Sequence, residues 1–442
     1  MKIPRKPPSK ESLILNLKTE SLMDFMSTVP GILVRGKYQH WDKLIHLPPP
    51  EGLDHKTWWL VIKMHRRGNY KQIPLKDLKA GPFVFLVTDL MTQQFHNLDL
   101  GAGGSIQMPE QITNPDTRDR YYIGSLIEEA ITSSQLEGAA TTRVVAKEMI
   151  RSGRNPKDRS ERMILNNFLT MKRICEIRNE PLTRNLILEL HRMVTKSTLD
   201  NPDAEGRFRR ADEKVEVGDD YGNTFHIPPP ADELEKRIEL MCYFANETTA
   251  NNYIHPAIRS IILHFWLAYD HPFVDGNGRT ARALFYWPML RHGYWLFEFV
   301  SISQTILKAP TQYGRAFLLT ETDDNDLTYF IHYHLKVMDD AVHQLHAYIK
   351  RKAVELKKTE AEIKGITILN HRQRALIGHA LRHPTFNYTI ESHRMSHDVV
   401  YQTARSDLLN LVDRNLLTAR KQSSTWIFTP PAGLEEQLQN LA

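Results

Sequence analysis

The most constraining feature of the sequence is one short stretch, which reads His-Pro-Phe-Val-Asp-Gly-Asn-Gly-Arg-Thr-Ala-Arg from His271 to Arg282. Apolar side chains recur at helical spacing just before it, at Ile258, Ile261, Ile262, Phe265 and Tyr269. This pattern predicts a buried helix that ends at His271, because the residue before a proline is biased away from helical geometry. Two glycines then allow a tight turn, and a second helix is expected to begin near Gly278 with Arg279 and Arg282 on one face.

The residue types in this stretch suit the binding of phosphate and the activation of a hydroxyl group. Backbone N–H groups of a glycine-rich turn at a helix N-terminus attract anions, and two guanidiniums add bidentate contacts to phosphate. Asp275 supplies a hard oxygen ligand for Mg²⁺ held together with substrate phosphates, and His271 is suited to accept a proton near neutral pH. Taken alone, each residue is typical of a helix end, a turn or a solvated face, so it is their joint occurrence that indicates an active site.

The stretch resembles the signature of the Fic family, His-x-Phe-x-(Asp/Glu)-Gly-Asn-Gly-Arg-x-x-Arg, at every fixed position. The resemblance implies a mainly α-helical domain that transfers AMP from ATP to a hydroxyl group of a protein. It implies that His271 is the general base, that Asp275 positions Mg²⁺, and that an anion hole is formed by Gly276, Asn277 and Gly278.

The same resemblance assigns roles to the two arginines. It implies that Arg279 holds the β- or γ-phosphate and that Arg282 holds the γ-phosphate, while Phe273 is an anchor in the core. Relatives that transfer phosphate tend to carry lysine where this chain has Gly278. Glycine at this position therefore favours transfer of a nucleotide.

A second motif precedes the first in the chain, at the end of a helix predicted over about 117–138, where Gly138 is a natural C-cap. From the residues alone, Glu137 is a solvated carboxylate at a helix end, which the helix dipole slightly disfavours. The resemblance changes this interpretation, because Ser133, Glu137 and Gly138 match the (Ser/Thr)-x-x-x-Glu-(Gly/Asn) motif of an inhibitory helix in many Fic proteins. It implies that Glu137 pairs with Arg282 within one chain and competes with the γ-phosphate of ATP.

Two further segments flank the catalytic stretch. Residues 215–217 and 224–227 surround a turn-rich segment and predict a β-hairpin, which in Fic proteins is the flap that aligns the target by adding a strand. Pro288 is expected to end or kink the second catalytic helix. Tyr313 lies where relatives place residues near the adenine, although Ala309 and Pro310 stand where an asparagine is usual.

The last part of the chain predicts a separate domain. Charged residues dominate 351–365, which indicates a helical extension or linker, and 366–442 contain three predicted helices followed by two strands that turn at 422–424. This order resembles a winged helix-turn-helix, which implies either DNA binding or a surface for protein contact and self-association. The residues that could face DNA are His397, Gln402, Arg405, Arg420 and Lys421.

Composition sets the remaining limits. The chain has 442 residues, a net charge of +5 and two cysteines, Cys175 and Cys242, both in apolar helical patterns. Two cysteines are too few for a disulfide framework, the N-terminus has no apolar signal region, and no apolar run approaches the length of a membrane span. We therefore expect a cytoplasmic protein without membrane contact.

We predict a mainly α chain with four parts: an N-terminal region over 1–110, partly disordered or packed on the core; a Fic catalytic domain over 111–350; a linker over 351–365; and a winged-helix-like domain over 366–442. The predicted reaction uses ATP and Mg²⁺ to attach AMP to a tyrosine, serine or threonine hydroxyl of a target protein or of the chain itself. Alternatives left open are removal of AMP by the same site, transfer of another phosphate-containing group, and a DNA-binding regulator that uses the Fic domain as a nucleotide sensor. DNA and a second copy in a homodimer are left open as partners.

Overall fold

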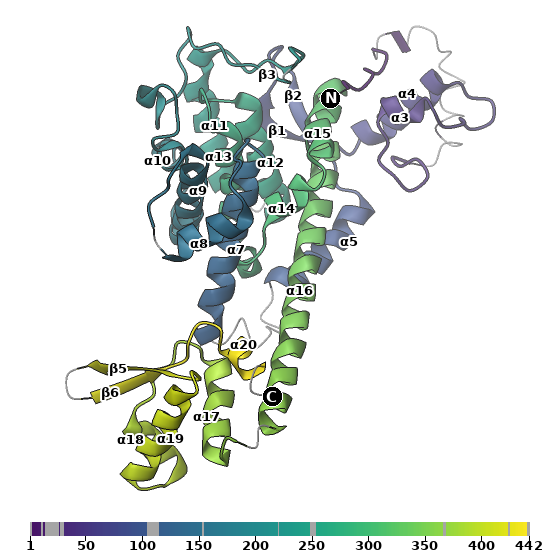
Figure 1. Cartoon of the computed structure of the whole chain (residues 1–442). Helices are drawn as coiled ribbons and strands as arrows, with labels where there is room; N and C mark the ends of the chain where they lie inside the picture. The colour runs from purple at the N-terminus through teal and green to yellow at the C-terminus, as the bar shows by residue number, and fades with distance from the viewer. Residues whose placement is uncertain are drawn as a thin grey trace. The chain divides into compact units, whose positions relative to one another are not determined.

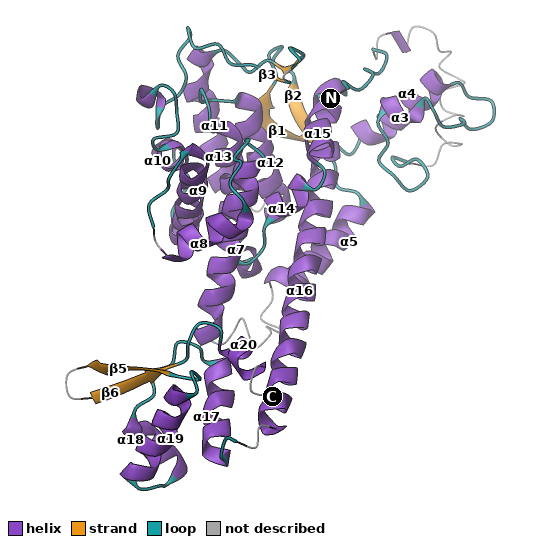
Figure 2. Ribbon diagram, viewed as in Figure 1, coloured by secondary structure: helices purple, strands orange, loops and turns teal. Residues whose placement is uncertain are grey.

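A computed structural model of the chain describes residues 2–9, 12–13, 26, 31–103, 115–152, 154–219, 221–247, 253–365, 368–422 and 425–439, without the side chains of 115–123, 151–152, 352–353 and 355–365. Helices form most of this structure, and its strands occur as short hairpins (Figure 2). The predicted fold class, mainly α with small β-hairpins, is confirmed. The chain divides into two compact units, Met1–Gly104 with Ser125–Val342 and Ser105–Gly124 with His343–Ala442.

Helices follow one another through most of the first unit. The α-helices that lie wholly in this unit are α3 (Trp41–Leu44), α4 (His55–Arg67), α5 (Asp89–Leu98), α8 (Arg143–Ser152), α9 (Arg159–Glu176), α10 (Arg184–Thr195), α11 (Leu234–Asn246), α12 (Pro256–Asp270), α13 (Asn277–Arg291), α14 (Ile302–Leu307) and α15 (Pro310–Thr322). Two helices have residues in both units, α7 (Pro115–Gln135) and α16 (Thr328–Gly365). Short helical turns are η1 (Asp99–Gly103), η2 (Ile177–Asn179), η3 (Pro202–Ala204), η4 (Ala231–Glu233) and η6 (Trp295–Glu298).

The first unit contains two antiparallel hairpins. The strands are β1 (Lys71–Lys76) with β2 (Pro82–Phe85), and β3 (Val217–Gly218) with β4 (Thr224–His226). The second of these is the hairpin that the sequence predicts before the catalytic helices. Its register pairs Val217 with His226 and Gly218 with Thr224, and the ladder is irregular between these pairs.

The N-terminal residues of the first unit form a hydrophobic cluster that is tied to residues 323–329 of the same unit. Trp58 and Trp59 are buried in this cluster, on a helix capped by Asp54, whose carboxylate accepts the Thr57 N–H. On the same helix, Nζ of Lys63 lies 2.9 Å from Oδ1 of Asp323, and Nη1 of Arg66 donates to the Tyr329 hydroxyl at 2.9 Å. The paired tryptophans are therefore core residues of the N-terminal region.

Helices α12 and α13 form the centre of the first unit and pack side by side (Figure 1). Every residue of α12 except Ala268 is buried, and so is every residue of α13 except Gly278 and Arg291. Pro288 does not end α13, which continues to Arg291. The expected stop is overridden because the helix is enclosed by neighbours. Pro288 deprives only the Leu284 carbonyl of its helical partner, and the Ser260 hydroxyl of α12 donates to the next carbonyl, that of Phe285.

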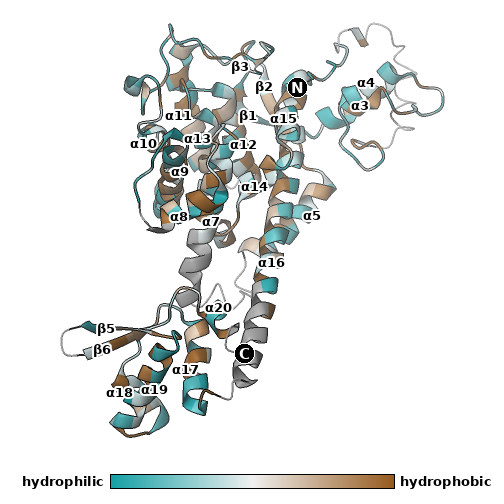
Figure 3. Cartoon of the chain, in the orientation of Figure 1, coloured by the Kyte–Doolittle hydropathy of each residue, from teal (hydrophilic) through white to brown (hydrophobic). Residues whose placement is uncertain are grey.

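The second unit contains α17 (His371–Arg382), α18 (Ile390–His397), α19 (Tyr401–Asp413), β5 (Thr418–Gln422), β6 (Thr425–Thr429) and α20 (Leu434–Gln439). Brown and teal segments alternate along α17 and α19 in Figure 3, and the apolar residues of both helices meet in one buried cluster with Phe428. Strands β5 and β6 pair in register from Thr418 with Thr429 to Gln422 with Thr425, and the predicted turn at 423–424 lies outside the described residues. The winged-helix assignment stays a prediction.

Across the described ranges, none of the helices combines the length and the apolar composition needed to cross a membrane.

Candidate active site

The loop between α12 and α13 places the predicted catalytic residues. His271 caps α12 with φ 45° and ψ 55°, in the left-handed region, and its N–H donates to the Leu267 carbonyl at 3.0 Å. Gly276 caps the start of α13 with φ 83°. The sequence therefore predicted both helix ends to within a residue or two, and the left-handed residues explain why the chain reverses so sharply here.

Asn277 stabilises the loop through its side-chain amide, and Gly276 fits the loop because it has no side chain. The Asn277 amide accepts the Phe273 N–H at 2.9 Å and donates to the Phe273 carbonyl at 2.8 Å, so its side chain is committed to the loop. A methyl group built on Gly276 would lie 2.5 Å from Cγ2 of Thr195. Of the three residues expected to form the anion hole, Asn277 and Gly276 thus fix the backbone. Any role of theirs toward a phosphate belongs to the Asn277 N–H, because the Gly276 N–H already donates to the Asp275 carboxylate.

His191, which sequence reasoning missed, supports this loop from α10. Its Nδ1 accepts the Gly206 N–H at 3.0 Å, so the ring proton is on Nε2 and donates to the Asp275 carbonyl at 2.9 Å. The ring stacks on Phe273 with centroids 3.6 Å apart, and burial lowers the pKa of His191 to about 4. The imidazole is therefore neutral at pH 7 and fixes the loop that carries Asp275.

His271 is half-buried and its ring is held in one tautomer. Its Nδ1 lies 3.2 Å from the Ala268 carbonyl, an acceptor, so Nδ1 carries the proton and Nε2 keeps a free electron pair. Burial lowers the pKa of His271 to about 4. The His271 carbonyl accepts from Nε of Arg209 at 2.9 Å, and Arg209 also donates to the Pro229 carbonyl. The geometry thus gives a neutral imidazole whose Nε2 is able to accept a proton.

Arg279 and Arg282, the two arginines of α13 that the sequence predicts in the site, are both almost completely buried. Nη1 of Arg279 donates to the Val194 carbonyl at 3.1 Å, while its Nε has no hydrogen-bond partner among the described residues. Burial lowers the pKa of Arg279. A buried guanidinium with an unsatisfied N–H is ready to bind an anion, because an uncompensated cation in the interior is unfavourable.

Glu137 occupies the site from the end of α7. Its carboxylate lies 2.7 Å from Nη2 of Arg282. Arg282 also donates two hydrogen bonds of 2.9 Å to Ser133, one from Nε to the hydroxyl and one from Nη2 to the backbone carbonyl. Burial opposes the charge of Arg282, but the neighbouring carboxylate raises its pKa overall. A methyl group on Gly278 would lie 2.2 Å from Oε1 of Glu137, so the space that a lysine side chain would need at this position is filled. Gly138 follows with φ 87° in the expected left-handed turn.

Asp275 is the residue that could hold a divalent cation. Its side chain is 43% exposed and lies 3.7 Å from Arg279 and 3.8 Å from Arg159, whose own side chain is 55% exposed. One carboxylate oxygen accepts the Gly276 N–H, which leaves the other available to a metal. Among the residues that the structure describes, no group of three or more histidine, cysteine or acidic side chains could hold a metal ion. Mg²⁺ fits this position because it commonly binds through one carboxylate together with substrate phosphates and water.

Tyr313 lies close to the arginine end of the site. Its hydroxyl oxygen is 2.8 Å from Nε2 of His264, and the guanidinium of Arg282 is a further neighbour of the same oxygen. Burial raises the pKa of Tyr313 to about 12, so the hydroxyl stays protonated. The structure therefore brings Tyr313 near Arg282, whereas contact with a nucleotide base stays a prediction.

The predicted flap is fastened to the catalytic helix by His226 of β4. Nε2 of the ring lies 2.7 Å from the Tyr269 carbonyl, and Nδ1 lies 2.7 Å from Oε2 of Glu321. Both neighbours accept hydrogen bonds, so the ring satisfies both of them at once when it is protonated and positively charged. The Glu321 carboxylate raises the pKa of His226 despite the opposing effect of burial.

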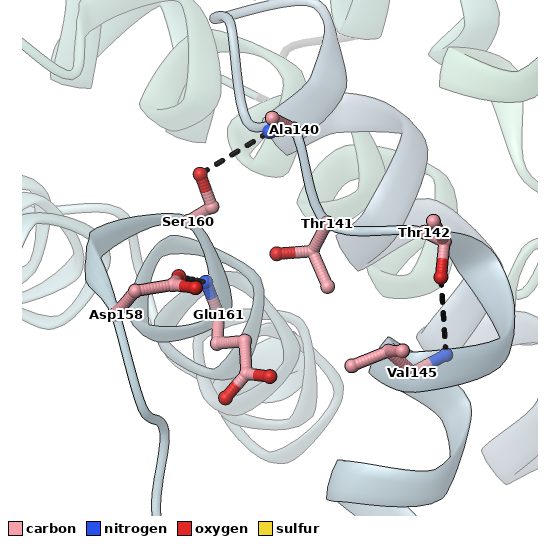
Figure 4. A pocket seen from close by; sticks show the side chains of 7 residues that line it. All are labelled: Ala140, Thr141, Thr142, Val145, Asp158, Ser160 and Glu161. Carbon is pink, nitrogen blue, oxygen red and sulfur yellow. Dashed lines mark hydrogen bonds between the residues drawn. The ribbon is translucent and has the colours of Figure 1, made fainter.

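A hollow of about 240 Å³ lies among the segment after α7, the start of α8 and the start of α9 (Figure 4). It is lined by Ala140, Thr141, Thr142, Val145, Asp158, Ser160 and Glu161. Both of its carboxylates already have partners: Asp158 accepts the Glu161 N–H at 2.8 Å, and Glu161 accepts from Arg154 at 2.7 and 2.8 Å. The hollow therefore offers hydroxyl groups but no unpaired charge, and it contains none of the predicted site residues.

Comparisons with known proteins place the family resemblance on part of the chain. Residues 181–289 match the model of the Fic/DOC family. The chain is similar to the protein adenylyltransferase Fic of Drosophila grimshawi, with 33% identity over 179 residues, and to that of Nematostella vectensis, with 28% identity over 192 residues. These matches cover 40% and 43% of this chain but only 34% and 41% of the two relatives, so the chain spans well under half of their length.

A solved structure extends the similarity in fold. The crystal structure of a Fic family protein from Desulfovibrio desulfuricans G20 aligns with 78% of this chain and 97% of that protein, with a TM-score of 0.51 and 20% sequence identity. At this identity the likeness shows the fold alone. It agrees with the helical architecture expected from the sequence.

Proposed function

We propose that this chain, whose residues 181–289 form a Fic/DOC domain, is a protein adenylyltransferase that is held inactive by Glu137. The observation that carries the proposal is the convergence on one loop of a neutral His271, the buried guanidiniums of Arg279 and Arg282, and Gly278 without a side chain. A site with these groups suits in-line transfer of a phosphoryl-type group from a polyphosphate donor. The name shared by the matching relatives supports AMP as the group transferred and ATP as the donor.

In the proposed reaction, the oxygen of a tyrosine, serine or threonine hydroxyl forms a bond to the α-phosphorus of ATP. The bond from that phosphorus to the bridging oxygen of pyrophosphate breaks, and the hydroxyl proton passes to Nε2 of His271. General base catalysis of this kind contributes about 10²–10⁴-fold to a rate. The guanidiniums of Arg279 and Arg282 stabilise the charge on the leaving pyrophosphate.

Asp275 would hold Mg²⁺ in this reaction, through the carboxylate oxygen that faces away from the Gly276 N–H. The ion, when bound, neutralises charge on the phosphate oxygens. The chain keeps Asp275 in place because Nε2 of His191 donates a hydrogen bond to the Asp275 backbone carbonyl.

Glu137 inhibits the reaction by occupying Arg282 in this proposal. The γ-phosphate and the carboxylate compete for one guanidinium, and a phosphate displaced from Arg282 leaves the α-phosphorus poorly aligned with the attacking oxygen. The hairpin of β3 and β4 would present the target segment by pairing with it as an added strand.

The test uses wild type, Glu137→Gly, and Glu137→Gly with His271→Ala, each incubated with Mg²⁺ and ATP labelled at the α- or the γ-phosphate. We expect protein label from the α-phosphate only, stronger in Glu137→Gly than in wild type and absent when His271 is also replaced. The same gel reports self-modification as label on the chain itself. Protein label from the γ-phosphate contradicts AMP transfer. The proposal is also contradicted if Glu137→Gly still binds ATP but labels neither itself nor any candidate target.

Removal of AMP is the second candidate, and the position of Glu137 favours it. The Glu137 side chain is 28% exposed and lies close enough to His271 to affect its ring electrostatically, so it could orient a water molecule toward a phosphodiester bond. Wild type should then release labelled AMP from a modified protein, and Glu137→Gly should not.

The ligand of the second unit is a separate question. Exposed apolar side chains at the turn between α18 and α19, Met395, Val400 and Tyr401, favour contact with protein, including a second copy of the chain. DNA stays the alternative, through Arg405, Arg420 and Lys421, which are all exposed. Steeply salt-dependent binding to duplex DNA would decide for DNA. Cys175 and Cys242 form no disulfide bond, which fits the reducing conditions of the cytoplasm.

A further inference from the structure

The proposed inhibitory segment, which is α7 and the turn after it as far as Gly138, contacts α13 in a regular register. Glu129, Ser133 and Glu137 follow one another at intervals of four residues, so they form one stripe along α7 and the turn after it. They face a stripe of α13 with the same interval, Tyr286, Arg282 and Gly278. Ser133 bonds to Arg282, Glu137 lies against both Arg282 and Gly278, and Glu129 adjoins Tyr286. The segment therefore lies antiparallel to α13 and contacts it at three levels.

The first level contains a carboxylate that the proposed reaction does not use. Glu129 is 2% exposed. Its Oε2 accepts from the Ser301 hydroxyl at 2.8 Å and from the Ser303 N–H at 3.0 Å, and its Oε1 accepts from the Ser303 hydroxyl at 2.5 Å. The hydroxyl of Tyr286 lies beside the carboxylate and accepts the Ile302 N–H at 2.9 Å. All of these partners belong to the first turn of α14, the residue before it, and α13.

The two glutamates of the stripe differ in how they are held. Glu137 is partly exposed and pairs with a cation, so a phosphate can take its place. Glu129 has no ion pair among the described residues, and its donors are neutral groups inside the core. A buried carboxylate is retained only when several hydrogen bonds compensate its desolvation, and removing them is strongly unfavourable.

We infer that Glu129 is a positioning residue for inhibition, which fixes the register of α7 along α13 so that Glu137 meets Arg282. This inference rests on the proposed function. A slip of α7 by one helical turn would move Glu137 by about 5.4 Å, well beyond the reach of an ion pair. The bonds from Glu129 to Ser301 and Ser303 prevent that slip, because they fasten the helix two turns before the inhibitory carboxylate.

The test compares Glu129→Ala with the matched control Glu128→Ala. Glu128 is the adjacent residue on the same helix, and its carboxylate pairs with Arg143 at 3.0 Å and with Lys147, both on α8, instead of the core around α13. We expect Glu129→Ala to raise protein labelling from α-labelled ATP about fivefold or more, toward the level of Glu137→Gly, and Glu128→Ala to stay near wild type.

Three further variants separate positioning from general damage. Glu129→Gln keeps an acceptor for the Ser303 N–H and should restore most of the inhibition. Ser303→Ala removes one donor from the opposite side and should release inhibition partly, even if Glu129→Ala fails to fold. The double variant Glu129→Ala with Glu137→Gly should label as strongly as Glu137→Gly, because both changes break the same contact with Arg282.

Hydrogen exchange of the α7 amides over 126–135 gives a readout that does not need activity. These amides should exchange faster in Glu129→Ala than in Glu128→Ala. If Glu137→Gly transfers nothing, the proposed function fails while exchange still tests the anchor. Equal labelling by Glu128→Ala and Glu129→Ala would overturn the inference, as would wild-type labelling and exchange in Glu129→Ala. Labelling of the double variant below that of Glu137→Gly would also overturn it, because Glu129 would then support the active site itself.

Discussion

The loop between α12 and α13 and the proposed inhibitory segment at the end of α7 are held by different kinds of contact. In the loop, buried groups bond to fixed neutral partners, as Asn277 bonds to the Phe273 backbone and His191 to the Asp275 carbonyl. In the segment, the partly exposed Glu137 forms an ion pair with Arg282. The loop contacts are fixed, whereas the proposed function requires this ion pair to yield to a competing phosphate.

This difference teaches where regulation can act without damage to catalysis. Arg282 is buried, so loss of Glu137 removes its charged partner, although the two bonds from its guanidinium to Ser133 remain. A buried network of neutral bonds is unfavourable to break at any single point. Changes in the loop should therefore reduce activity or stability, and changes at Glu137 should raise activity at a moderate cost in stability.

The largest expected effect comes from His271→Asn in a Glu137→Gly background. Asparagine tolerates the left-handed conformation that His271 adopts, but it has no imidazole to accept a proton. We expect labelling from α-labelled ATP to fall about 10²–10⁴-fold with little change in the melting temperature. Labelling within a few-fold of the parent would show that Nε2 of His271 is not the base.

Graded release of Arg282 should give the next largest effect. Glu137→Gly removes the ion pair and should raise labelling about 5–150-fold, while Ser133→Ala removes only the bond from Nε of Arg282 and should raise it less. Both variants should melt at a moderately lower temperature than wild type, because each leaves the buried Arg282 guanidinium with one partner fewer. A stronger activation by Ser133→Ala than by Glu137→Gly would contradict competition for the guanidinium as the cause of inhibition.

Gly276→Ala should affect stability more than either of those changes. The residue has φ 83°, and a methyl group there would lie 2.5 Å from Thr195. We expect the free energy of unfolding to fall by about 1–3 kcal/mol, measured by denaturant titration. Gly293→Ala is the matched control, because Gly293 has φ 84° with no atom within 4 Å of the added methyl group. An equal loss in both variants would assign the effect to backbone strain alone.

The sequence predicted local features better than contacts between distant segments. The stop at His271, the turn at Gly276 and the mainly helical fold follow from residues close together in the chain. By contrast, Glu137 reads as a solvated acid until Arg282 is found beside it, 145 residues away in the sequence. His191 and Glu129 were missed for the same reason, since their partners lie on other elements and no periodic pattern marks them. Of the two outcomes predicted for Pro288, an end or a kink of the helix, the end does not occur, because burial overrides the local preference of proline.

The smallest effect concerns His226, which joins the hairpin to the fixed part of the site. Three groups face its ring: the Glu321 carboxylate from α15, and the Tyr269 carbonyl and the Asp270 carboxylate from α12. The folded pKa of His226 is raised above its ordinary value of 6.5, so its contribution to stability is complete below that pH. The contribution is lost as the pH rises through the folded pKa, because the neutral ring keeps only one of its two donors.

We therefore expect the free energy of unfolding to decline by about 1 kcal/mol above neutral pH in wild type, with the hairpin amides losing protection first. His226→Gln has one donor group at every pH, so its stability should show less of this slope. The free energy of unfolding should depend on pH in the same way in the Glu137→Gly background. Among the described residues, the Glu137 carboxylate forms no hydrogen bond with His226. Equal slopes in wild type and His226→Gln would mean that the hairpin is fastened by its backbone rather than by a charged histidine, and the flap would then belong with the displaceable parts of the site.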